Sequence, residues 1–304
     1  MQVGVSKIWI NLYSLINKNM KTALIGIGLM LAGTLNAQNV VVRDLLKEWS
    51  FTKGIEGPAI DSYGNLYAVN FERQGTIGIV TPAGEASIYV VLPEGSVGNG
   101  IRFDKAGYMY IADYTKHNIL KVDPKERSVS VFAHNPKMNQ PNDIAISPTT
   151  EFLYASDPNW KDSTGNLWMI NRKGDVILLE ANMGTTNGVE VSPDGRRLYV
   201  NESIQRKIWV YDIKRDGMLE NKRLFYSFND FGMDGMRCDR KGNLYVTRHG
   251  KGTIVVLTKR GKQINEITLK GKLSSNIVMD HNKKTPVFYV TMADRGCFEY
   301  FSLK

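Results

Sequence analysis

A hairpin unit recurs six times along this chain, and it limits the folds that the chain can adopt. The first, second and fifth copies read Gly-x-x-x-Asp, and every copy continues with a turn and a strand of the Leu-Tyr-Val type. Two short strands joined by a turn rich in Gly, Asp, Asn or Pro are typical of a β-hairpin. The copies cover residues 57–70, 100–113, 143–156, 188–201, 235–248 and, in a weaker form, 276–291.

Two further strands follow the hairpin in most copies, for example at 207–213 and 222–227 in the fourth and at 253–258 and 263–269 in the fifth. Four strands per unit, at a period near 44 residues, are typical of a propeller blade. The sixth unit ends after its third strand, and we expect residues 40–51 to supply the missing outer strand. The sequence therefore predicts an all-β, six-bladed β-propeller that forms a single domain over residues 38–304.

The first 37 residues differ from the rest of the chain. They contain three lysines and no acidic residue, and an apolar run at 23–35 precedes Ala37. This pattern predicts a secretory signal peptide over residues 1–37, cleaved after Ala37, and an exported protein that is periplasmic or secreted. The alternative is an uncleaved anchor helix, but the apolar run is short for a bilayer span. We expect no stable membrane insertion after cleavage.

Charge and cysteine content argue against several classes of function. The net charge is +9, and the three leader lysines leave +6 on the mature chain, where basic and acidic residues are interspersed. Nothing in this distribution indicates nucleic-acid binding. Cys238 and Cys297 form no CxxC pair and have no histidine nearby, which favours buried free thiols over a metal or redox site. The sequence leaves the oligomeric state open.

The residue before each inner strand carries a side-chain oxygen in every copy. The spacings between these residues are 43, 43, 45, 47 and 42. Because the inner strands of a propeller line its axis, equivalent residues at their starts converge on one mouth of the channel. The residues are Glu56, Asn99, Asn142, Asn187, Asp234 and, in the sixth copy, Asn276 or its neighbour Ser275.

Six converging acceptors suggest a bound cation. Two buried carboxylates that face each other repel, and a cation removes that cost. Carboxylate and amide oxygens suit a hard ion, with Ca²⁺ first and Mg²⁺ or Mn²⁺ next, whereas Zn²⁺ prefers His or Cys. The alternative is that Asn and Asp cap the turns before these strands. Capping accounts for one or two of the residues, but neither for six in register nor for Glu56.

Four motifs in order make the chain similar to a known family. They lie around residues 56–58, 141–143, 187–200 and 234–246. From Ile55 to the C-terminus the sequence resembles the senescence marker protein/gluconolactonase family, also called regucalcin-like. The resemblance implies a six-bladed propeller with a catalytic Ca²⁺ or similar ion in its channel. It also implies hydrolysis of sugar lactones or, in some relatives, of organophosphates.

The same resemblance implies roles for individual residues. Glu56, Asn187 and Asp234 match the metal ligands, and Asn142 matches a further ligand or a substrate contact. The sequence departs from the family pattern at Ala59, where Trp often follows Pro, and at Gln140, where Arg often stands. These departures leave the metal ligands intact and bear on the choice of substrate.

We therefore expect a metal-dependent lactonase that acts on a small-molecule, sugar-type lactone, with Asp234 as the general base. Substrate contacts are expected from Asn99, Asn142 and Asn276 beside the metal, and from His117 and Trp160 on the rim loops. One alternative is a calcium-plugged propeller that binds a glycan or a protein without catalysis. Another is a metal-independent, strictosidine-synthase-like propeller, against which the presence of both Glu56 and Asp234 argues.

Overall fold

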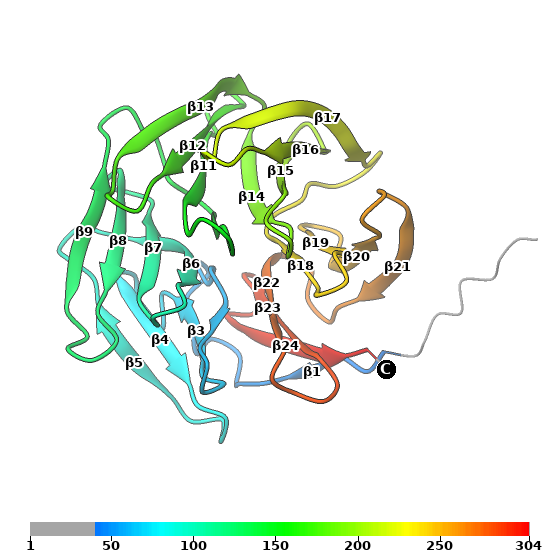
Figure 1. Ribbon diagram of the computed structural model, residues 1–304. Helices are drawn as coiled ribbons and strands as arrows, with labels where there is room; N and C mark the ends of the chain where they lie inside the picture. The colour runs from blue at the N-terminus through cyan, green and yellow to red at the C-terminus, as the bar shows by residue number, and fades with distance from the viewer. Residues whose placement is uncertain (1–39, 304) are drawn as a thin grey trace, which may run out of the picture. The chain divides into compact units, whose positions relative to one another are not determined.

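The computed structural model describes residues 40–303, so the predicted leader and its cleavage site lie outside the described residues. These residues form six antiparallel sheets of four strands each, arranged around a common axis (Figure 1). No helix occurs between residues 40 and 303, and so none there could cross a membrane. The predicted all-β, six-bladed β-propeller is confirmed.

Each blade is a meander whose first strand is the innermost. The first three blades comprise β2 (Ala59–Ile60), β3 (Leu66–Val69), β4 (Thr76–Val80), β5 (Ala86–Val91); β6 (Gly98–Phe103), β7 (Met109–Asp113), β8 (Asn118–Val122), β9 (Val129–His134); and β10 (Ile144–Ile146), β11 (Leu153–Asn159), β12 (Thr164–Ile170), β13 (Val176–Met183). The last three comprise β14 (Thr186–Val191), β15 (Arg197–Glu202), β16 (Lys207–Ile213), β17 (Leu219–Ser227); β18 (Met236–Cys238), β19 (Leu244–Arg248), β20 (Thr253–Leu257), β21 (Gln263–Thr268); and β22 (Ser274–Asp280), β23 (Val287–Met292), β24 (Cys297–Ser302) with β1 (Arg43–Asp44).

The two ends of the propeller domain close the ring, as the sequence predicts. Strand β1 pairs antiparallel with β24, with Arg43 opposite Tyr300, and the two strands lie side by side in Figure 1. The Phe51 ring is buried and makes edge-to-face contacts with Phe71 and Phe298, at centroid distances of 5.0 and 5.5 Å. The N-terminal segment thus joins the last blade to the first through both backbone pairing and aromatic packing.

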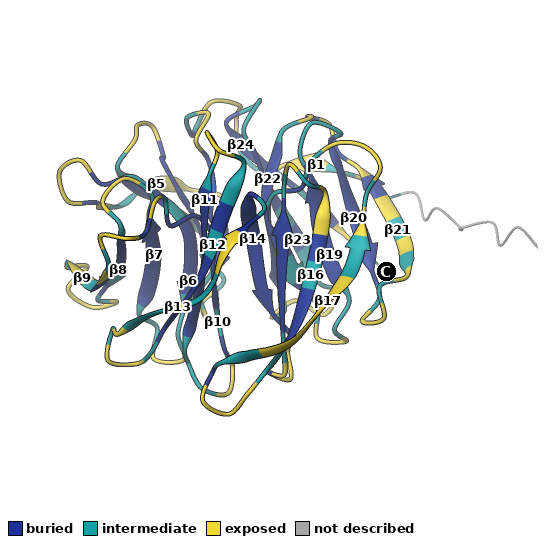
Figure 2. Ribbon diagram, turned by 90° about the horizontal axis from the view of Figure 1, so that it is seen from above, coloured by how far each residue is buried: buried dark blue, intermediate teal, exposed yellow. Residues whose placement is uncertain are grey.

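The hydrophobic core lies between neighbouring blades. One cluster joins the first two blades, for example, through Val69 and Ile111, which are both fully buried. The inner strands are covered on both faces, so β14 is buried along its whole length, whereas the outer strand β17 is largely exposed (Figure 2). Strands buried on both faces read as continuous apolar runs, which accounts for the Leu-Tyr-Val pattern of the second strand in each copy.

The Asp and Tyr of the repeat shape the hairpin between the first two strands. In the first blade, Asp61 Oδ1 accepts hydrogen bonds from the backbone N–H groups of Tyr63 and Asn65, each at 2.9 Å. The Tyr67 hydroxyl donates to Asp61 Oδ2 at 2.9 Å. Asp104 and Asp239 accept equivalent bonds from their own turns. These turns lie at the ends of the inner strands, and they fix the direction in which each inner strand runs along the channel.

Both cysteines are buried free thiols, as predicted. Cys238 lies in β18 and Cys297 in β24, which belong to different sheets. Burial raises the pKa of the Cys297 thiol to about 12, so this sulfur stays protonated and unreactive at neutral pH.

Candidate metal and substrate site

The starts of the inner strands are tied to one another around the channel axis. Each of these hydrogen bonds joins two neighbouring blades. In each bond, at least one of the two groups belongs to a predicted acceptor residue or to a residue within two positions of it. These bonds bring the starts of the six inner strands together in one ring. They are Gly100 N to Asn142 O (2.8 Å), Val189 N to Asp143 Oδ2 (3.2 Å), Asn201 Nδ2 to Asp234 O (2.5 Å), Gly235 N to Ser275 O (2.7 Å) and Ser275 Oγ to Ile55 O (2.8 Å).

Glu56 and Asp234 place two carboxyl groups against each other in this ring. Burial, together with the charges of Asp234 and Asp143, raises the pKa of Glu56 well above its usual value. Burial and the charge of Asp143 raise the pKa of Asp234 to about 7. Hydrogen bonds from the Gly57 N–H and from asparagine amides offset only part of these rises, and protonation or a bound cation would offset the remaining repulsion.

Two asparagine side chains at the ring positions have unused oxygens. Asn142 Oδ1 and Asn187 Oδ1 are buried and accept no hydrogen bond from any described residue. The Asn187 amide also contacts the Asp234 carboxyl group and partly offsets the rise in its pKa. A buried polar atom without a partner costs about 1–3 kcal/mol, so two such oxygens beside two carboxyl groups indicate a ligand that accepts their lone pairs.

The backbone of Asn99 packs against Gly57, the residue that follows Glu56. A side chain at Gly57 would place its Cβ 2.0 Å from the Asn99 carbonyl oxygen, and Gly57 has a φ of 61°. Only glycine meets both conditions without strain. The glycine after Glu56 therefore brings the first two inner strands into contact and keeps Asn99 at the mouth.

In the sixth blade the ring position belongs to Ser275, and Asn276 stands one residue further along. Ser274 pairs with Met292 as Thr186 pairs with Glu202, which makes Ser275 the equivalent of Asn187. The Asn276 side chain fills the space beside Gly235, where a Cβ would lie 1.9 Å from the Asn276 Cγ atom. The Asn276 amide thereby lies close to Glu56, whose pKa it partly lowers.

Two residues near the pair were given no role from the sequence. Asp143 stands where four other copies have glycine, and that exception is the signal that could have revealed it. Its oxygens accept hydrogen bonds from Ile144 N and Val189 N. His249 follows β19 on the same mouth, and its Nδ1 atom lies 3.6 Å from Asp234 Oδ2.

The other two predicted substrate residues, His117 and Trp160, make no contact with the carboxyl pair among the described residues. His117 precedes β8 with a φ of 60°, and its carbonyl oxygen accepts a hydrogen bond from Asn135 N. Trp160 stands at the tip of the β11–β12 hairpin, where Asn159 pairs with Thr164, and it contacts the Tyr114 hydroxyl group. Both residues lie in loops that follow second strands, and their contact with a substrate stays a prediction.

The side chains in the ring fit a hard divalent cation. Two carboxyl groups and two unpaired amide oxygens form an all-oxygen donor set, which Ca²⁺ accepts with variable geometry. Between residues 40 and 303, no three His, Cys, Asp or Glu side chains are grouped so that they could hold a metal. A cation in the ring would therefore need the amide oxygens as ligands, and this composition disfavours Zn²⁺.

Comparison with known proteins gives a consistent result for most of the chain. The model of the SMP-30/Gluconolactonase/LRE-like region matches residues 49–294. A gluconolactonase of Zymomonas mobilis is 28% identical over 246 residues, which are 69% of this chain and 67% of that protein. The diisopropyl-fluorophosphatase of Loligo vulgaris is 26% identical over 241 residues, which are 69% of this chain and 76% of that enzyme.

A solved structure shares the fold. The calcium-binding protein regucalcin from Agrobacterium tumefaciens superposes with a TM-score of 0.75 at 19% identity. The superposition covers 86% of this chain and 93% of that protein.

Proposed function

Because the chain belongs to the SMP-30/gluconolactonase/LRE-like family, we propose that it is a metal-dependent hydrolase of a sugar-type lactone. The observation that carries the proposal is the ring at the channel mouth. It combines the carboxyl groups of Glu56 and Asp234 with the unpaired oxygens of Asn142 and Asn187. The similarity to a gluconolactonase supports the choice of a lactone as the substrate.

In this proposal Glu56, Asn187 and Asp234 bind Ca²⁺, and Asn142 is a further ligand or contacts the substrate. Mg²⁺ or Mn²⁺ would suit the same oxygens, and Zn²⁺ would suit them less well. A cation there would act as a Lewis acid that polarises the lactone carbonyl group. The calcium binding named for the regucalcin from Agrobacterium tumefaciens supports the first choice of metal.

The chain's own residues would supply the proton transfer and the orientation of the substrate. Asp234 would accept the proton of the attacking water, because a bound cation would keep this carboxyl group ionised at the mouth, where water and substrate meet. His249 Nδ1 stands 3.6 Å from its Oδ2 atom and limits the directions in which that carboxyl group can turn. Asn99, Asn142 and Asn276 would bind the substrate hydroxyl groups, since amides can both donate and accept hydrogen bonds.

Export is part of the same proposal. Residues 1–37 would be removed as a signal peptide, so that the mature protein begins at Gln38 and works outside the cytoplasm. N-terminal sequencing of the protein recovered from the exported fraction tests this point. A mature chain that retains residues 1–37 would contradict it.

A second candidate reaction is the hydrolysis of phosphotriesters. The 26% identity with diisopropyl-fluorophosphatase favours it, and a hard cation with a carboxylate base could serve either substrate class. The two candidates differ in the substrate that the rim accepts, and a panel that contains both classes separates them.

Hydrolysis of a lactone panel with Ca²⁺ and with a chelator tests the proposal. Asp234→Asn should lower kcat by about 10²–10⁴-fold, and excess Ca²⁺ should not restore it. Glu56→Gln should weaken metal binding, and excess Ca²⁺ should partly restore its rate. Asp216→Asn is the matched control, since Asp216 is exposed in the turn between β16 and β17, at the end of its blade away from the ring.

The outcomes distinguish the alternatives. Parent-like rates in both ring variants would refute the mechanism. A parent protein that binds Ca²⁺ but hydrolyses neither lactones nor phosphotriesters would favour the calcium-plugged binding module. Hydrolysis that survives complete removal of metal would favour a metal-independent propeller.

A further inference from the structure

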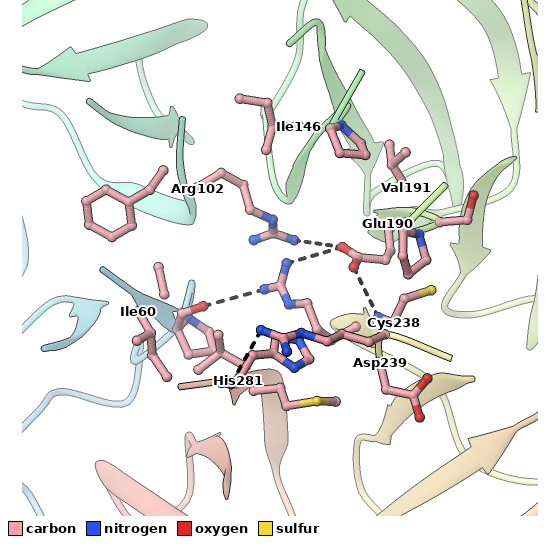
Figure 3. Close-up of a pocket in the computed structure, with 18 of the residues that line it drawn as sticks. Ile60, Arg102, Ile146, Glu190, Val191, Cys238, Asp239 and His281 are labelled. Atoms are coloured by element: carbon pink, nitrogen blue, oxygen red, sulfur yellow. Dashed lines mark hydrogen bonds and ion pairs between the residues drawn. The ribbon is translucent and has the colours of Figure 1, made fainter. Parts of the chain in front are cut away.

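A cavity opens at the end of the channel opposite the carboxyl pair. It has a volume of 320 Å³, near the lower end of the roughly 300–1,000 Å³ typical of ligand pockets. Its walls come from the last residues of the inner strands, such as Ile60, Phe103 and Ile146, and from the turns that follow them. The labelled residues of Figure 3 surround it. Along an inner strand, the residue that lines this cavity stands three positions after the ring residue, which corresponds to roughly 10 Å.

The floor of this cavity carries two arginines and one glutamate. Arg237 Nη1 donates to Glu190 Oε2 at 3.2 Å, and Arg102 Nη2 lies 3.7 Å from the same oxygen. Arg102 Nη2 also lies 3.3 Å from Asp143 Oδ1, on the side of the ring. Figure 3 shows the Arg102 guanidinium group directed at Glu190 across the cavity floor.

Arginine N–H groups at this floor are unused, whereas each carboxylate oxygen that lines it already accepts a hydrogen bond. Glu190 uses Oε1 for Cys238 N and Oε2 for Arg237. Asp239 accepts bonds from its own turn through both oxygens. Arg102 is 7% exposed, and its Nη2 atom donates no hydrogen bond to any described residue.

A further positive group, Arg240, stands at the entrance to the cavity. Arg240 is exposed there, and its Nη2 atom makes only a long bond of 3.4 Å to the His281 carbonyl oxygen. Burial and the neighbouring Arg237 lower the pKa of Arg102 to about 10, so Arg102 is charged at neutral pH. Glu190 and Asp143 already offset part of the repulsion between the two guanidinium groups, and an anion at the floor would offset more of it and accept the unused N–H.

The walls above the floor are largely apolar. Ile60, Ile101, Phe103, Ile146, Val191 and Met279 line them. We propose that this pocket binds a small organic carboxylate, with the carboxylate on Arg102 and Arg237 and an apolar body against these walls. A planar carboxylate matches the fork of a guanidinium group, and the apolar walls favour it over inorganic phosphate. The inference does not rest on the proposed hydrolase function, although Arg102 also pairs with Asp143, whose charge acts on the ring carboxyl groups.

Calorimetric titration with benzoate tests the proposal, with benzamide as the neutral probe of the same shape. The titrations are made in EDTA, which prevents binding of benzoate to a cation in the ring. We expect benzoate to bind with a dissociation constant of about 1 mM or lower, and benzamide and inorganic phosphate to bind at least tenfold more weakly. Equal binding of benzoate and benzamide, stronger binding of phosphate, or no saturable benzoate binding would overturn the proposal.

Two substitutions locate the site. Arg240→Ala should weaken benzoate binding at least threefold, and Ile146→Trp, which fills the cavity, should abolish it. Arg260→Ala is the matched control, because Arg260 is an exposed arginine of the neighbouring basic groove that does not line this cavity. Arg240→Ala and Ile146→Trp leave the buried ion pairs intact. They should therefore not impair folding, as a substitution of Arg102 would. Benzoate binding that survives Ile146→Trp, or that Arg260→Ala weakens as much as Arg240→Ala does, would place the anion elsewhere and refute the inference.

Discussion

Calcium affinity should depend steeply on pH, because the cation must displace a proton that Asp234 holds more tightly than an exposed carboxyl group would. The pKa of Asp234 is raised to about 7 in the metal-free protein. At pH 5 only about 1% of such a group is ionised, so the apparent affinity for Ca²⁺ should be about 100-fold weaker at pH 5 than at pH 8. Glu56, whose pKa is also raised, can only add to this dependence.

Isothermal titration calorimetry in two buffers of different ionisation enthalpy measures both the affinity and the number of protons released. Near pH 6, binding should release about one proton from Asp234 alone. Asp216→Asn, which alters an exposed carboxylate, should keep the full pH dependence. An apparent affinity that stays constant between pH 5 and 8, with no proton release, would refute the argument that burial and like charge set the state of this pair.

The metal-free protein should show the opposite trend in stability. A carboxyl group whose pKa is raised on folding stabilises the protein below its unfolded pKa of 3.8, and this contribution disappears as pH rises through about 7. A shift of that size corresponds to about 4 kcal/mol. Melting temperatures in EDTA should therefore fall between pH 4 and 8, and Ca²⁺ should restore stability most strongly at the high end.

Three further predictions concern the fold around the site. Phe51→Ala should lower the free energy of unfolding by about 3–5 kcal/mol, measured by urea denaturation, because the buried ring joins the last blade to the first. Gly235→Ala should lower the melting temperature, since its Cβ would lie 1.9 Å from the Asn276 Cγ atom, and adding Asn276→Ala should recover most of the loss. Hydrogen bonding to Arg295 lowers the pKa of Asp44 to about 2, so this carboxylate stabilises the protein above pH 3.8 and less as pH falls through 2. Asp44→Asn should flatten the acid loss of melting temperature, and an unchanged slope would contradict that role.

The fold could be predicted from the sequence because the blades repeat the same local signals. Asp61 and Tyr67 mark the turn and the second strand of a blade, and the structure shows them bonded to each other. The closing strand was also predictable, since the sixth unit lacks one and residues 40–51 are left over. The pairing of Arg43 with Tyr300 depends on contacts between the two ends of the domain, and a repeat gives no register for them.

The candidate site could be predicted only in part. Aligning the copies identifies Glu56, Asn187 and Asp234 as neighbours, but it cannot choose between Ser275 and Asn276. That choice depends on strand register, which pairs Ser274 with Met292. The contact between His249 and Asp234 depends on how the loop after β19 folds back over the mouth, and the repeat pattern carries no signal for that path.

The arginine layer at the other mouth was missed for a more specific reason. Side chains alternate along a regular strand, so Asn99 and Arg102, three residues apart, should point to opposite faces. The pairing of β6 with β7, however, shifts register between Gly98 and Ile101, and the pairings of β14 and β22 shift at the equivalent place. An irregularity of this kind redirects the side chains that follow it.

Because the irregularity coincides with the acceptor position, one inner strand can present an oxygen to the first mouth and a charged group to the second. The same short strands could therefore supply both the proposed cation site and the proposed anion site, at opposite ends of one channel.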